Sequence, residues 1–497
     1  GAGSTKISYI YAYNGTRPVA KLENVAYNAI PSNLVTDIQN ATEEDIDTKV
    51  NNLRDYYIDK NVMVTTYTYD PLIGITQMTD PGGNKTFYDY DSFGRLKNIR
   101  DHKGDKVQSY EYVYNSSPGI NFVRTTNYRD ATESTSFINT TFLDGLGRPI
   151  QEIAHGQSGE GNDLVTPIVY DGLGRTAKEY LPYDRGTKSM TMAIDAVTQA
   201  EAFYNTSYFE NTANPYTESV FEDSPLNRVI RQAAPGAVWE KDSGREIEFE
   251  YHTNTNSEVR FFEVSSPTGT PQLKLNTQNQ GYYAKNQLYK TITKDENHQG
   301  NTKIGTVEEF KNKLGQVVLK RHWSRREGAG NFAVAFDTYY VYDDYGNLTF
   351  VLPPELSDQI ISGNSLVGNH NALMDKWGYR YRYDHRNRMI HKKLPGRQTE
   401  LIAYDPMDRV VATSPAKSPF LGEDADGTLH TRYDAFNRVT HTYWSATGIG
   451  GETQRANFEN SIGNTFSESP RTSPTSANGI ELYYTTNVLP APGPVYL

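Results

Sequence analysis

The stretch His155-Gly-Gln-Ser-Gly-Glu-Gly161 contains residue types that could support nucleophilic catalysis by serine. It is close to the Gly-x-Ser-x-Gly pattern, in which a sharp strand-to-helix turn exposes the serine hydroxyl. Glu160 stands where the last glycine belongs, and no strand-to-helix elbow follows. The stretch is therefore predicted to be a loop without a catalytic role.

Two further groups have the residue types of metal ligands. His430 and His441 flank a turn symmetrically and are expected to face each other across a hairpin, but no nearby residue supplies a third or fourth ligand. Asp424 and Asp426 offer oxygen atoms at alternate positions, yet the loop lacks the bidentate glutamate of an EF-hand. An acidic turn tip explains them better, so no metal, cofactor or catalytic residue is predicted.

Other catalytic signatures are missing or weak. The sequence has no Gly-x-x-x-x-Gly-Lys-Ser/Thr phosphate loop, no His-Glu-x-x-His helix and no Gly-x-Gly-x-x-Gly dinucleotide turn. Its 60 acidic residues will place some carboxylates roughly 5–10 Å apart by chance, as in glycosidases. A glycan-active enzyme is therefore the least favoured of three functional hypotheses.

The elements that would position any site follow from a pattern that recurs along the chain. Phe87-Tyr-Asp-Tyr-Asp-Ser-Phe-Gly-Arg-Leu-Lys97 returns as Phe142-Leu-Asp-Gly-Leu-Gly-Arg-Pro-Ile150 and Val169-Tyr-Asp-Gly-Leu-Gly-Arg-Thr-Ala177. An aspartate that accepts backbone hydrogen bonds, followed by a glycine or asparagine that tolerates a left-handed conformation, is typical of a tight turn. The alternating residues on each side predict strands, so each copy is a β-hairpin.

Isolated hairpins are marginally stable, so many of them must pair side by side in one sheet. The turn aspartate and the arginine four residues later are well placed for a local ion pair, and the tyrosine completes a strand face. A sugar-binding surface of tyrosine and arginine is the alternative, but contacts between neighbouring hairpins explain these residues better. The residues expected to build the repeat turns are Tyr90, Asp91, Gly94, Arg95, Asp144, Gly147, Arg148, Tyr170, Asp171, Gly174, Arg175, Tyr342, Asp343, Gly346, Tyr383, Asp384, Arg388, Tyr404, Asp405, Arg409, Tyr433, Asp434 and Arg438.

Composition limits the classes of partner. The net charge of −11 argues against nucleic acid or an anionic membrane surface, and no apolar run approaches the roughly 18–20 residues of a membrane span. The first six residues resemble a cloning remnant rather than a signal peptide. The 37 Tyr and 19 Phe suit half-buried positions of a large sheet, and the absence of Cys excludes disulfides and thiolate metal sites.

Two blocks are expected along the chain. Residues 1–115 form the first, with a helix near 43–58, and residues 121–497 form the second, with 115–120 as the boundary. The second block is predicted to contain a helix near 189–204, a short helix at 353–361 and a mobile Pro/Ser-rich loop at 467–476. Residues 7–37 read as strands and loops.

The Tyr-Asp-x-x-Gly-Arg units at 90–95 and 170–175 resemble the YD repeats of the bacterial Rhs family, which teneurins and Tc-toxin shells share. The resemblance covers about residues 62–114 and 140–445. It implies an all-β spiral of antiparallel β-hairpins with two or three short accessory helices, whose wall encloses a polypeptide such as a toxin.

Three features depart from that family. The chain is shorter than typical shells with cargo, the Asp-Pro-x-Gly motif of the self-cleaving core is matched imperfectly at Asp70 and Asp405, and the order of the blocks is unusual. The chain is therefore expected to be a fragment, fusion or permutation of a larger repeat array.

The resemblance predicts a non-catalytic shell or scaffold, secreted or at the bacterial cell surface, with polypeptide cargo or further shell segments as partners. The alternative is an adhesion or assembly component that binds glycans or polymerises through open sheet edges. No nucleic acid partner and no membrane insertion are expected.

Overall fold

The computed structural model describes residues 7–23, 25–57, 62–114, 120–265, 270–298, 300, 302–325, 332–384, 386–419, 424–434, 438–462, 467–468, 470–477 and 480–484. Within them, 28 strands form one sheet. Its first part comprises β1 (Ile7–Ala12), β2 (Arg17–Glu23), β3 (Met63–Asp70), β4 (Gly74–Thr79), β5 (Lys85–Tyr90), β6 (Leu96–Arg100), β7 (Lys106–Val113), β8 (Asn121–Tyr128), β9 (Ser136–Leu143), β10 (Pro149–Ala154), β11 (Leu164–Val169), β12 (Lys178–Tyr180), β13 (Tyr183–Asp184), β14 (Tyr216–Phe221), β15 (Val229–Ala233) and β16 (Ile247–Thr253). Its second part comprises β19 (Tyr289–Lys294), β20 (Thr306–Lys311), β21 (Val317–Ser324), β22 (Val334–Tyr342), β23 (Leu348–Leu352), β26 (Tyr379–Tyr383), β27 (Met389–Lys393), β28 (Thr399–Tyr404), β29 (Val410–Lys417), β30 (Asp426–Asp434), β31 (Val439–Ser445) and β32 (Ser467–Glu468).

The sheet is a meander in which neighbours along the chain are neighbours in space. Antiparallel pairing runs from β1 to β12 and continues through β14, β15 and β16 to β19. It then runs from β19 to β23 and from β23 through β26 to β31. β13 pairs with β11 beside β12, and β32 adds a short parallel pairing to β30. The three small sheets pair β17 (Phe262–Ser265) with β18 (Gln272–Leu275), β24 (Ile361–Ser362) with β25 (Ser365–Leu366), and β33 (Pro470–Ala477) with β34 (Ile480–Tyr484).

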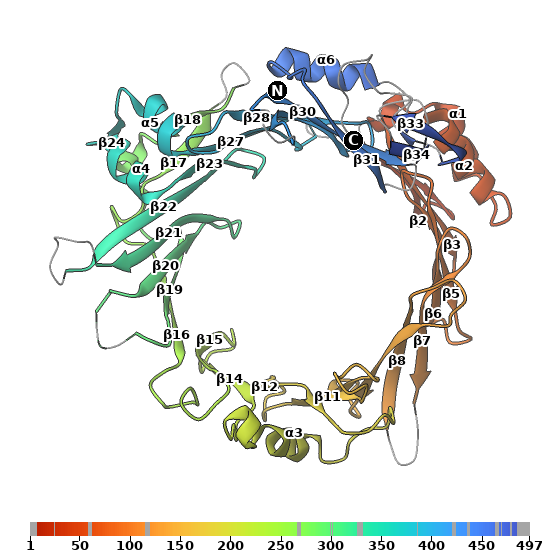
Figure 1. Cartoon of the computed structure of the whole chain (residues 1–497), viewed down its shortest axis with the longest axis horizontal. Helices are drawn as coiled ribbons and strands as arrows, with labels where there is room; N and C mark the ends of the chain where they lie inside the picture. The colour runs from red at the N-terminus through yellow and green to blue at the C-terminus, as the bar shows by residue number, and fades with distance from the viewer. Residues whose placement is uncertain are drawn as a thin grey trace.

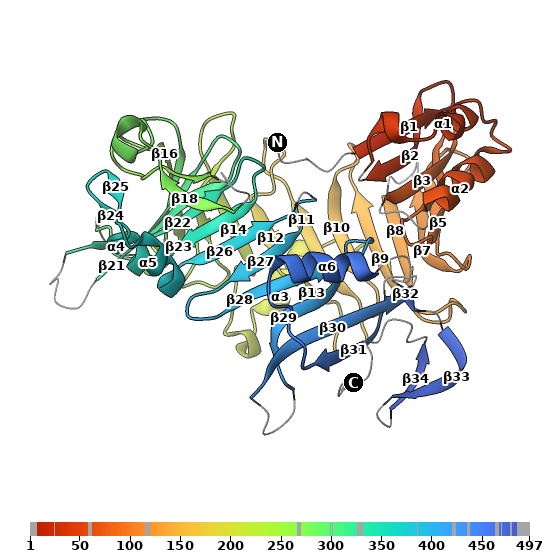
Figure 2. The same ribbon diagram turned by 90° about the horizontal axis from the view of Figure 1, so that it is seen from above.

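The right-handed twist of so many strands bends the sheet, and Figure 1 shows it encircling a central axis. The first strands lie toward one end of this axis, and β30, β31, β33 and β34 lie toward the other (Figure 2). The sheet is therefore a spiral of about one turn rather than a closed barrel. The all-β prediction of antiparallel hairpins with short helices is confirmed.

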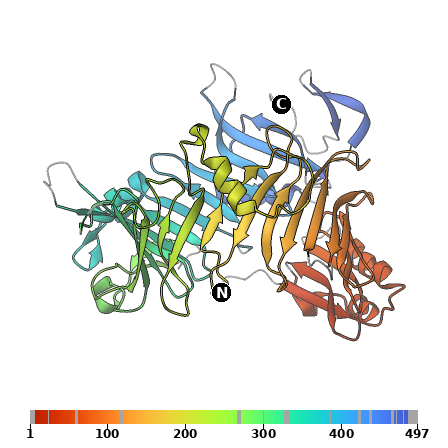
Figure 3. The ribbon, with the colours of Figure 1, turned by 90° about the horizontal axis from the view of Figure 1, so that it is seen from below.

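Six α-helices occur in the described residues, more than the two or three expected: α1 (Ser32–Gln39), α2 (Ile46–Tyr57), α3 (Ala196–Tyr204), α4 (Pro354–Gln359), α5 (His370–Trp377) and α6 (Glu452–Ile462). They lie on the outer side of the ring, and Figure 3 shows α3 crossing in front of the strands that it covers. No helix among the described residues is long and apolar enough to cross a membrane.

Helices α1 to α5 bury three apolar clusters against the outer face of the sheet. Val50 and Leu53 of α2 pack with Ile10, Leu22 and Val64 of the first strands. A second cluster joins α3 to β9–β11, and a third joins α4, α5 and the insertion 254–288 to β20–β23. Because side chains alternate along a strand, the opposite residues of the same strands face inward, where no helix lies.

Several local predictions need correction. Residues 32–39 form α1 where strands and loops were expected, since Val35 and Ile38 are buried on one face of a helix that begins directly after Pro31. The helix predicted for 189–204 begins only at Ala196, because the backbone N–H groups of Ser189 and Met190 donate to the buried Asp163 carboxylate. The helix predicted near 43–58 is α2, and the one at 353–361 is α4.

The loop predicted at 467–476 is wrong, because residues 470–477 form β33, paired with β34. The pairing shifts register between Pro470 and Thr475, and a short edge ribbon with such an irregularity tolerates proline. Of the predicted boundary at 115–120, residues 115–119 lie outside the described residues. The strands on either side, β7 and β8, pair over six residues. Sheet hydrogen bonding therefore continues from the first block into the second.

Candidate functional site

The repeat turns form the most regular polar constellation of the chain, and Asp91 shows how each is built. Its carboxylate accepts hydrogen bonds from the backbone N–H groups of Phe93 (2.8 Å) and Arg95 (3.0 Å). The N–H of Gly94 donates to the Asp91 carbonyl at 3.0 Å, and the φ of Gly94 is +72°, which favours glycine. The aspartate thus satisfies backbone donors that a two-strand ladder leaves free.

The arginine that ends each turn returns to the same aspartate. Nε of Arg95 donates to Oδ2 of Asp91 at 2.7 Å, and its Nη2 lies 2.6 Å from the same oxygen. These hydrogen bonds from Arg95 lower the pKa of Asp91, and the backbone and side chain of the matching arginines lower the pKa of Asp144 and Asp171. The same set of contacts recurs at Asp144–Arg148, Asp171–Arg175, Asp384–Arg388 and Asp405–Arg409.

Held flat by its aspartate, each arginine covers an aromatic ring of the next hairpin. The guanidinium carbon of Arg388 lies 4.6 Å from the ring centroid of Tyr404, and that of Arg409 lies 4.8 Å from Tyr433. Arg148 covers Tyr170 at 4.4 Å in the same way. This geometry is that of a cation–π contact, so each turn is coupled to the one after it.

The tyrosine hydroxyls add a second link between hairpins. Tyr404 donates to the carbonyl of Met389 at 2.8 Å, and Tyr433 donates to the carbonyl of Val410 at 2.9 Å. In both cases the acceptor directly follows the arginine that covers the ring. Tyr90 and Tyr383 make the same kind of bond to Ile75 and Leu348, at 2.7 and 2.9 Å.

Two of the predicted turns depart from this scheme. Asp343 caps its turn through Tyr345 and Asn347, and Asn347 takes the place of arginine, while Gly346 has the expected φ of +82°. The turn after Asp434 lies outside the described residues at 435–437, as does the Asp434 side chain, and Arg438 lies at the exposed start of the next strand. Tyr342 lies beside the Asp343 turn at the end of β22.

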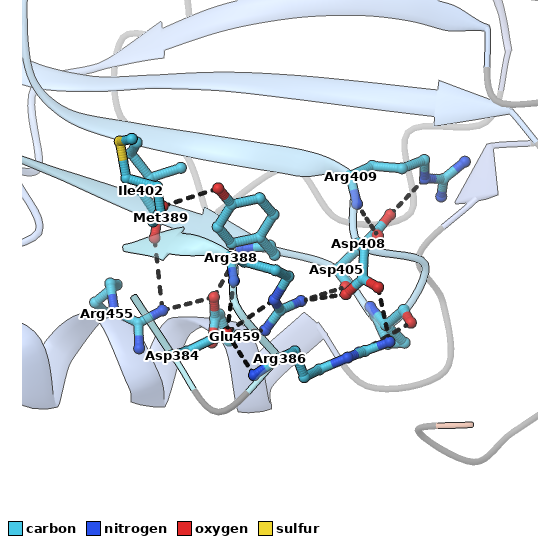
Figure 4. Close-up of polar contacts among 12 residues, drawn as sticks. Asp384, Arg386, Arg388, Met389, Ile402, Asp405, Asp408, Arg409, Arg455 and Glu459 are labelled. Atoms are coloured by element: carbon cyan, nitrogen blue, oxygen red, sulfur yellow. Dashed lines mark hydrogen bonds and ion pairs between the residues drawn. The ribbon is translucent and has the colours of Figure 1, made fainter. Parts of the chain in front are cut away.

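The turns become more buried toward the end of the chain. The side chains of Arg95 and Asp91 are 30% and 19% exposed, whereas those of Arg409 and Asp405 are 9% and 0% exposed. Figure 4 shows the Asp384–Arg388 and Asp405–Arg409 turns beside α6. Glu459 of α6 accepts the backbone N–H of Tyr404 at 2.8 Å, which ties the helix to this part of the ladder.

A second arginine, Arg386, joins the two turns of Figure 4. Its Nη2 lies 2.8 Å from Oδ2 of Asp408, whose other oxygen lies 2.8 Å from Nη1 of Arg388. Burial lowers the pKa of Arg386, opposed by Asp408 and by Glu23 at the end of β2. Burial also raises the pKa of Asp408, against the two arginines. The charge of Glu23, the last residue of β2, is thus among those that act on this late turn.

The histidine pair does not have the geometry that its spacing suggested. His430 lies opposite Tyr443 and Arg432 lies opposite His441, because a bulge after Arg432 shifts the register. His430 therefore stacks on Tyr443, with 4.5 Å between ring centroids, and its Nε2 lies 3.0 Å from Oγ of Ser445. Burial, followed by the nearby charge of Arg432, lowers the pKa of His430 to about 4.

The remaining candidates have structural partners. Nζ of Lys417 lies 2.6 Å from Asp424 and 3.3 Å from Asp426, so an ion pair occupies the acidic turn. The Ser158 hydroxyl accepts the backbone N–H groups of Glu160 and Asn162 and caps a turn as an aspartate would. Across the described ranges, no group of three or more His, Cys, Asp or Glu side chains could hold a metal ion.

Sequence reasoning missed two features of this region. α6 has no clear apolar stripe, and its inward residues include the buried Arg455, which pairs with Glu452 and Glu459. Arg432 and Glu468 form a buried pair at 3.2 Å, with side chains 3% and 1% exposed. Glu468 is 36 residues from Arg432, so no local spacing could indicate that pair. Glu452 and Glu459 stand three and four residues from Arg455, a helical spacing that could have indicated these ion pairs.

Comparison with known proteins gives limited context. The family described as "Domain of unknown function (DUF6443)" matches residues 120–253, so its match begins where the second predicted block begins. No curated protein matches the chain.

Solved structures similar to the chain include a crystal structure of TcdB2-TccC3, at 13% identity and a TM-score of 0.40, and one of TcdB2-TccC3-Cdc42, at 12% and 0.41. A Tc holotoxin pore of Photorhabdus luminescens matches at 13% identity and a TM-score of 0.40. These alignments cover 89%, 89% and 91% of this chain but only 19%, 22% and 22% of the others. The chain thus spans about a fifth of their length.

Proposed function

We propose that the chain is a non-catalytic wall segment that encloses a polypeptide. The observation that carries the proposal is the one-turn spiral of paired strands with all its helices on the outer side (Figure 1). Such an arrangement leaves one continuous face of the sheet uncovered and turned toward the axis. The arginine–tyrosine ladder supports the proposal because it couples successive hairpins and so stiffens the wall.

The chemistry of the inner face suits a contained chain. Tyr9 pairs with Lys21 and Lys21 pairs with Thr65 across the first strands, on the side opposite to the buried Ile10 and Leu22. Farther along, Thr141 pairs with Glu152, and Glu152 pairs with Thr166. Among these paired residues, hydroxyl and charged groups accompany the ring of Tyr9, so this part of the inner face is not a continuous apolar surface that would hold one partner tightly. Many weak contacts are expected instead.

The absence of cysteine makes this proposal testable with single labels. Glu152→Cys places a dye on the inner face, and Asn52→Cys places the same dye on the exposed side of α2 as the matched control. Reduced, carboxymethylated lactalbumin serves as a permanently unfolded polypeptide. We expect a saturable emission shift from the dye at 152 and none from the dye at 52. Equal emission shifts at both positions, or no emission shift at position 152, would contradict enclosure.

A cleft favours glycan binding as a second candidate function. It has a volume of about 850 Å³ and lies between the insertion 254–288 and the turns at 312–316 and 343–346. This volume is within the range of about 300–1,000 Å³ of ligand sites. Its lining combines Phe261, stacked on Tyr283 at 4.1 Å, with amide side chains such as Gln278 and Asn312. Titration with neutral oligosaccharides tests it, and Gln278→Ala should weaken any binding observed.

Assembly through sheet edges and a secreted or cell-surface location remain predictions. The free edge of β1 carries no charged side chain, which leaves it open to pairing. Pro substitution at Tyr9 would block such pairing, and fractionation of the producing cells would test the location.

A further inference from the structure

Many tips of the repeat turns carry large apolar side chains that are exposed to solvent. The tip residue is the third residue of each turn, two positions after the capping Asp, Ser or Asn. Seven tips are exposed: Leu72 (96%), Phe93 (81%), Leu146 (80%), Leu173 (77%), Leu226 (70%), Leu314 (82%) and Tyr345 (49%). Turn tips usually carry polar residues or glycine, so a series of exposed apolar tips is unusual.

These tips gather on one rim of the wall. Strand direction alternates along the meander, so every second connection lies at the same rim, and all seven tips belong to that set, here called the repeat rim. The connections at the opposite rim include turns with the same capping hydrogen bonds, but their tips are polar: Lys103, Glu160 and Asn297. The turn itself therefore does not require an apolar tip. Because paired strands are about 4.8 Å apart, neighbouring connections of one rim are about 10 Å apart. The β7–β8 connection and the insertion 254–288 interrupt the series of tips.

The late turns show what covers a tip. Arg386 and Met407 occupy the tip position of the last two repeat turns whose tips the structure describes, and Arg386 is only 8% exposed. The charge of Glu23 acts on Arg386, and Glu23 is the last residue of β2, at the opposite rim. Figures 1 and 2 show the last strands near the first strands and displaced from them along the axis, so this buried tip lies where the two ends of the spiral approach each other.

The opposite rim also offers a receptor for apolar tips. A pocket of about 450 Å³ lies beside the connection between β15 and β16, lined by Ala233, Ala234, Pro235, Trp239 and Ile247 among others. Glu296, in the connection between β19 and β20, lies at its margin and confirms its place on that rim. The chain therefore carries apolar side chains on one rim and an apolar pocket on the other.

We propose that the repeat rim is a docking surface for the opposite rim of a second copy of this chain. A second copy is the occupant because one chain supplies both complementary surfaces, the exposed apolar tips on one rim and a largely apolar pocket on the other. Contact between two different surfaces of identical chains is head-to-tail, so each added copy makes the wall taller. The docking stands on the rim geometry and does not depend on what the wall encloses.

Sedimentation velocity over a concentration series tests the docking with two variants of the full chain. The tip variant carries Leu146→Asn, Leu173→Asn and Leu226→Asn, since Asn297 shows that the turn accepts asparagine at its tip. The pocket variant carries Ala234→Glu, because Ala234 is an exposed residue of the pocket lining. Phe137→Thr, which removes an exposed ring from the inner face of β9, is the matched control.

We expect the wild type and the control to associate with increasing concentration, and each variant to associate at least about tenfold more weakly. An equimolar mixture of the two variants should recover dimers, because each supplies the surface that the other lacks, and should stop there. A monomeric wild type, or a mixture that stays monomeric while both variants keep the wild-type circular dichroism spectrum, would overturn the docking. Neither result would alter the response of the inner-face label, so the two proposals fail independently.

Discussion

Replacing Asp405 by alanine should open the sheet locally around β28 and β29. The Asp405 side chain is fully buried and accepts the backbone N–H groups of Met407 (2.9 Å) and Arg409 (3.0 Å) and Nε of Arg409 (2.7 Å). Asp405→Ala leaves a largely buried guanidinium and two backbone donors without this acceptor. Removing one partner of a buried ion pair costs about 3–5 kcal/mol.

The assay must be local, because in a repeat array each hairpin depends mainly on its neighbours and a global transition need not be two-state. Hydrogen exchange of residues 399–417 reports the opening directly. A cost of about 3–5 kcal/mol corresponds to exchange roughly 100- to 4,000-fold faster, at about 1.4 kcal/mol per factor of ten. The effect should spread to the neighbouring hairpin through Tyr433, which rests on Arg409.

Two variants separate the causes. Asp405→Asn keeps an oxygen for the backbone donors but removes the charge, so it should cost about 1.5–3 kcal/mol, the value of a hydrogen bond to a charged group. Asp91→Ala removes the same contacts from an exposed turn and should accelerate exchange far less. Equal changes in exchange for Asp91→Ala and Asp405→Ala, or an acceleration of less than about tenfold for Asp405→Ala, would contradict this reasoning. Burial would then not determine how much the turn contacts contribute to local stability.

Three further predictions concern single contacts. Gly147→Ala should destabilise its hairpin by about 1–2 kcal/mol because φ is +79°, whereas Gly145→Ala in the same turn should be nearly neutral. Tyr404→Phe should cost about 0.5–1.5 kcal/mol in a urea titration by removing one hydrogen bond and keeping the ring. The folded-state pKa of His430 is about 4 against an ordinary 6.5, so the folded state binds fewer protons between these values and stability should fall by roughly 3 kcal/mol as pH drops from 6.5 to 4. The His430→Phe protein should lose less stability over the same pH range.

The results that would contradict these predictions are distinct. Equal effects at Gly147 and Gly145 would mean that the left-handed conformation carries no cost. A Tyr404→Phe protein as stable as the wild type would show that water replaces the lost hydrogen bond. If the His430→Phe protein lost as much stability as the wild type between pH 6.5 and 4, the pH dependence would come from other groups.

The sequence alone predicted the hairpins, because every element needed for a tight turn lies within about five residues. Asp91, Gly94 and Arg95 are close along the chain, and their hydrogen bonds need no distant contact. Strand pairing between neighbours follows for the same reason, since a meander needs only short connections. The helix at 46–57 was also readable, because the stripe of Val50 and Leu53 has a helical period.

Tertiary structure alone decided which turns are buried and which tips stay exposed. Arg386 and Leu146 occupy the same position in two different repeat turns. Arg386 is buried near the first strands, whereas Leu146 faces solvent. That difference depends on the accumulated twist and curvature of many strands, which fixes where the spiral meets itself. Each strand pair contributes only a small twist, and no local spacing in the sequence indicates the total twist of the sheet.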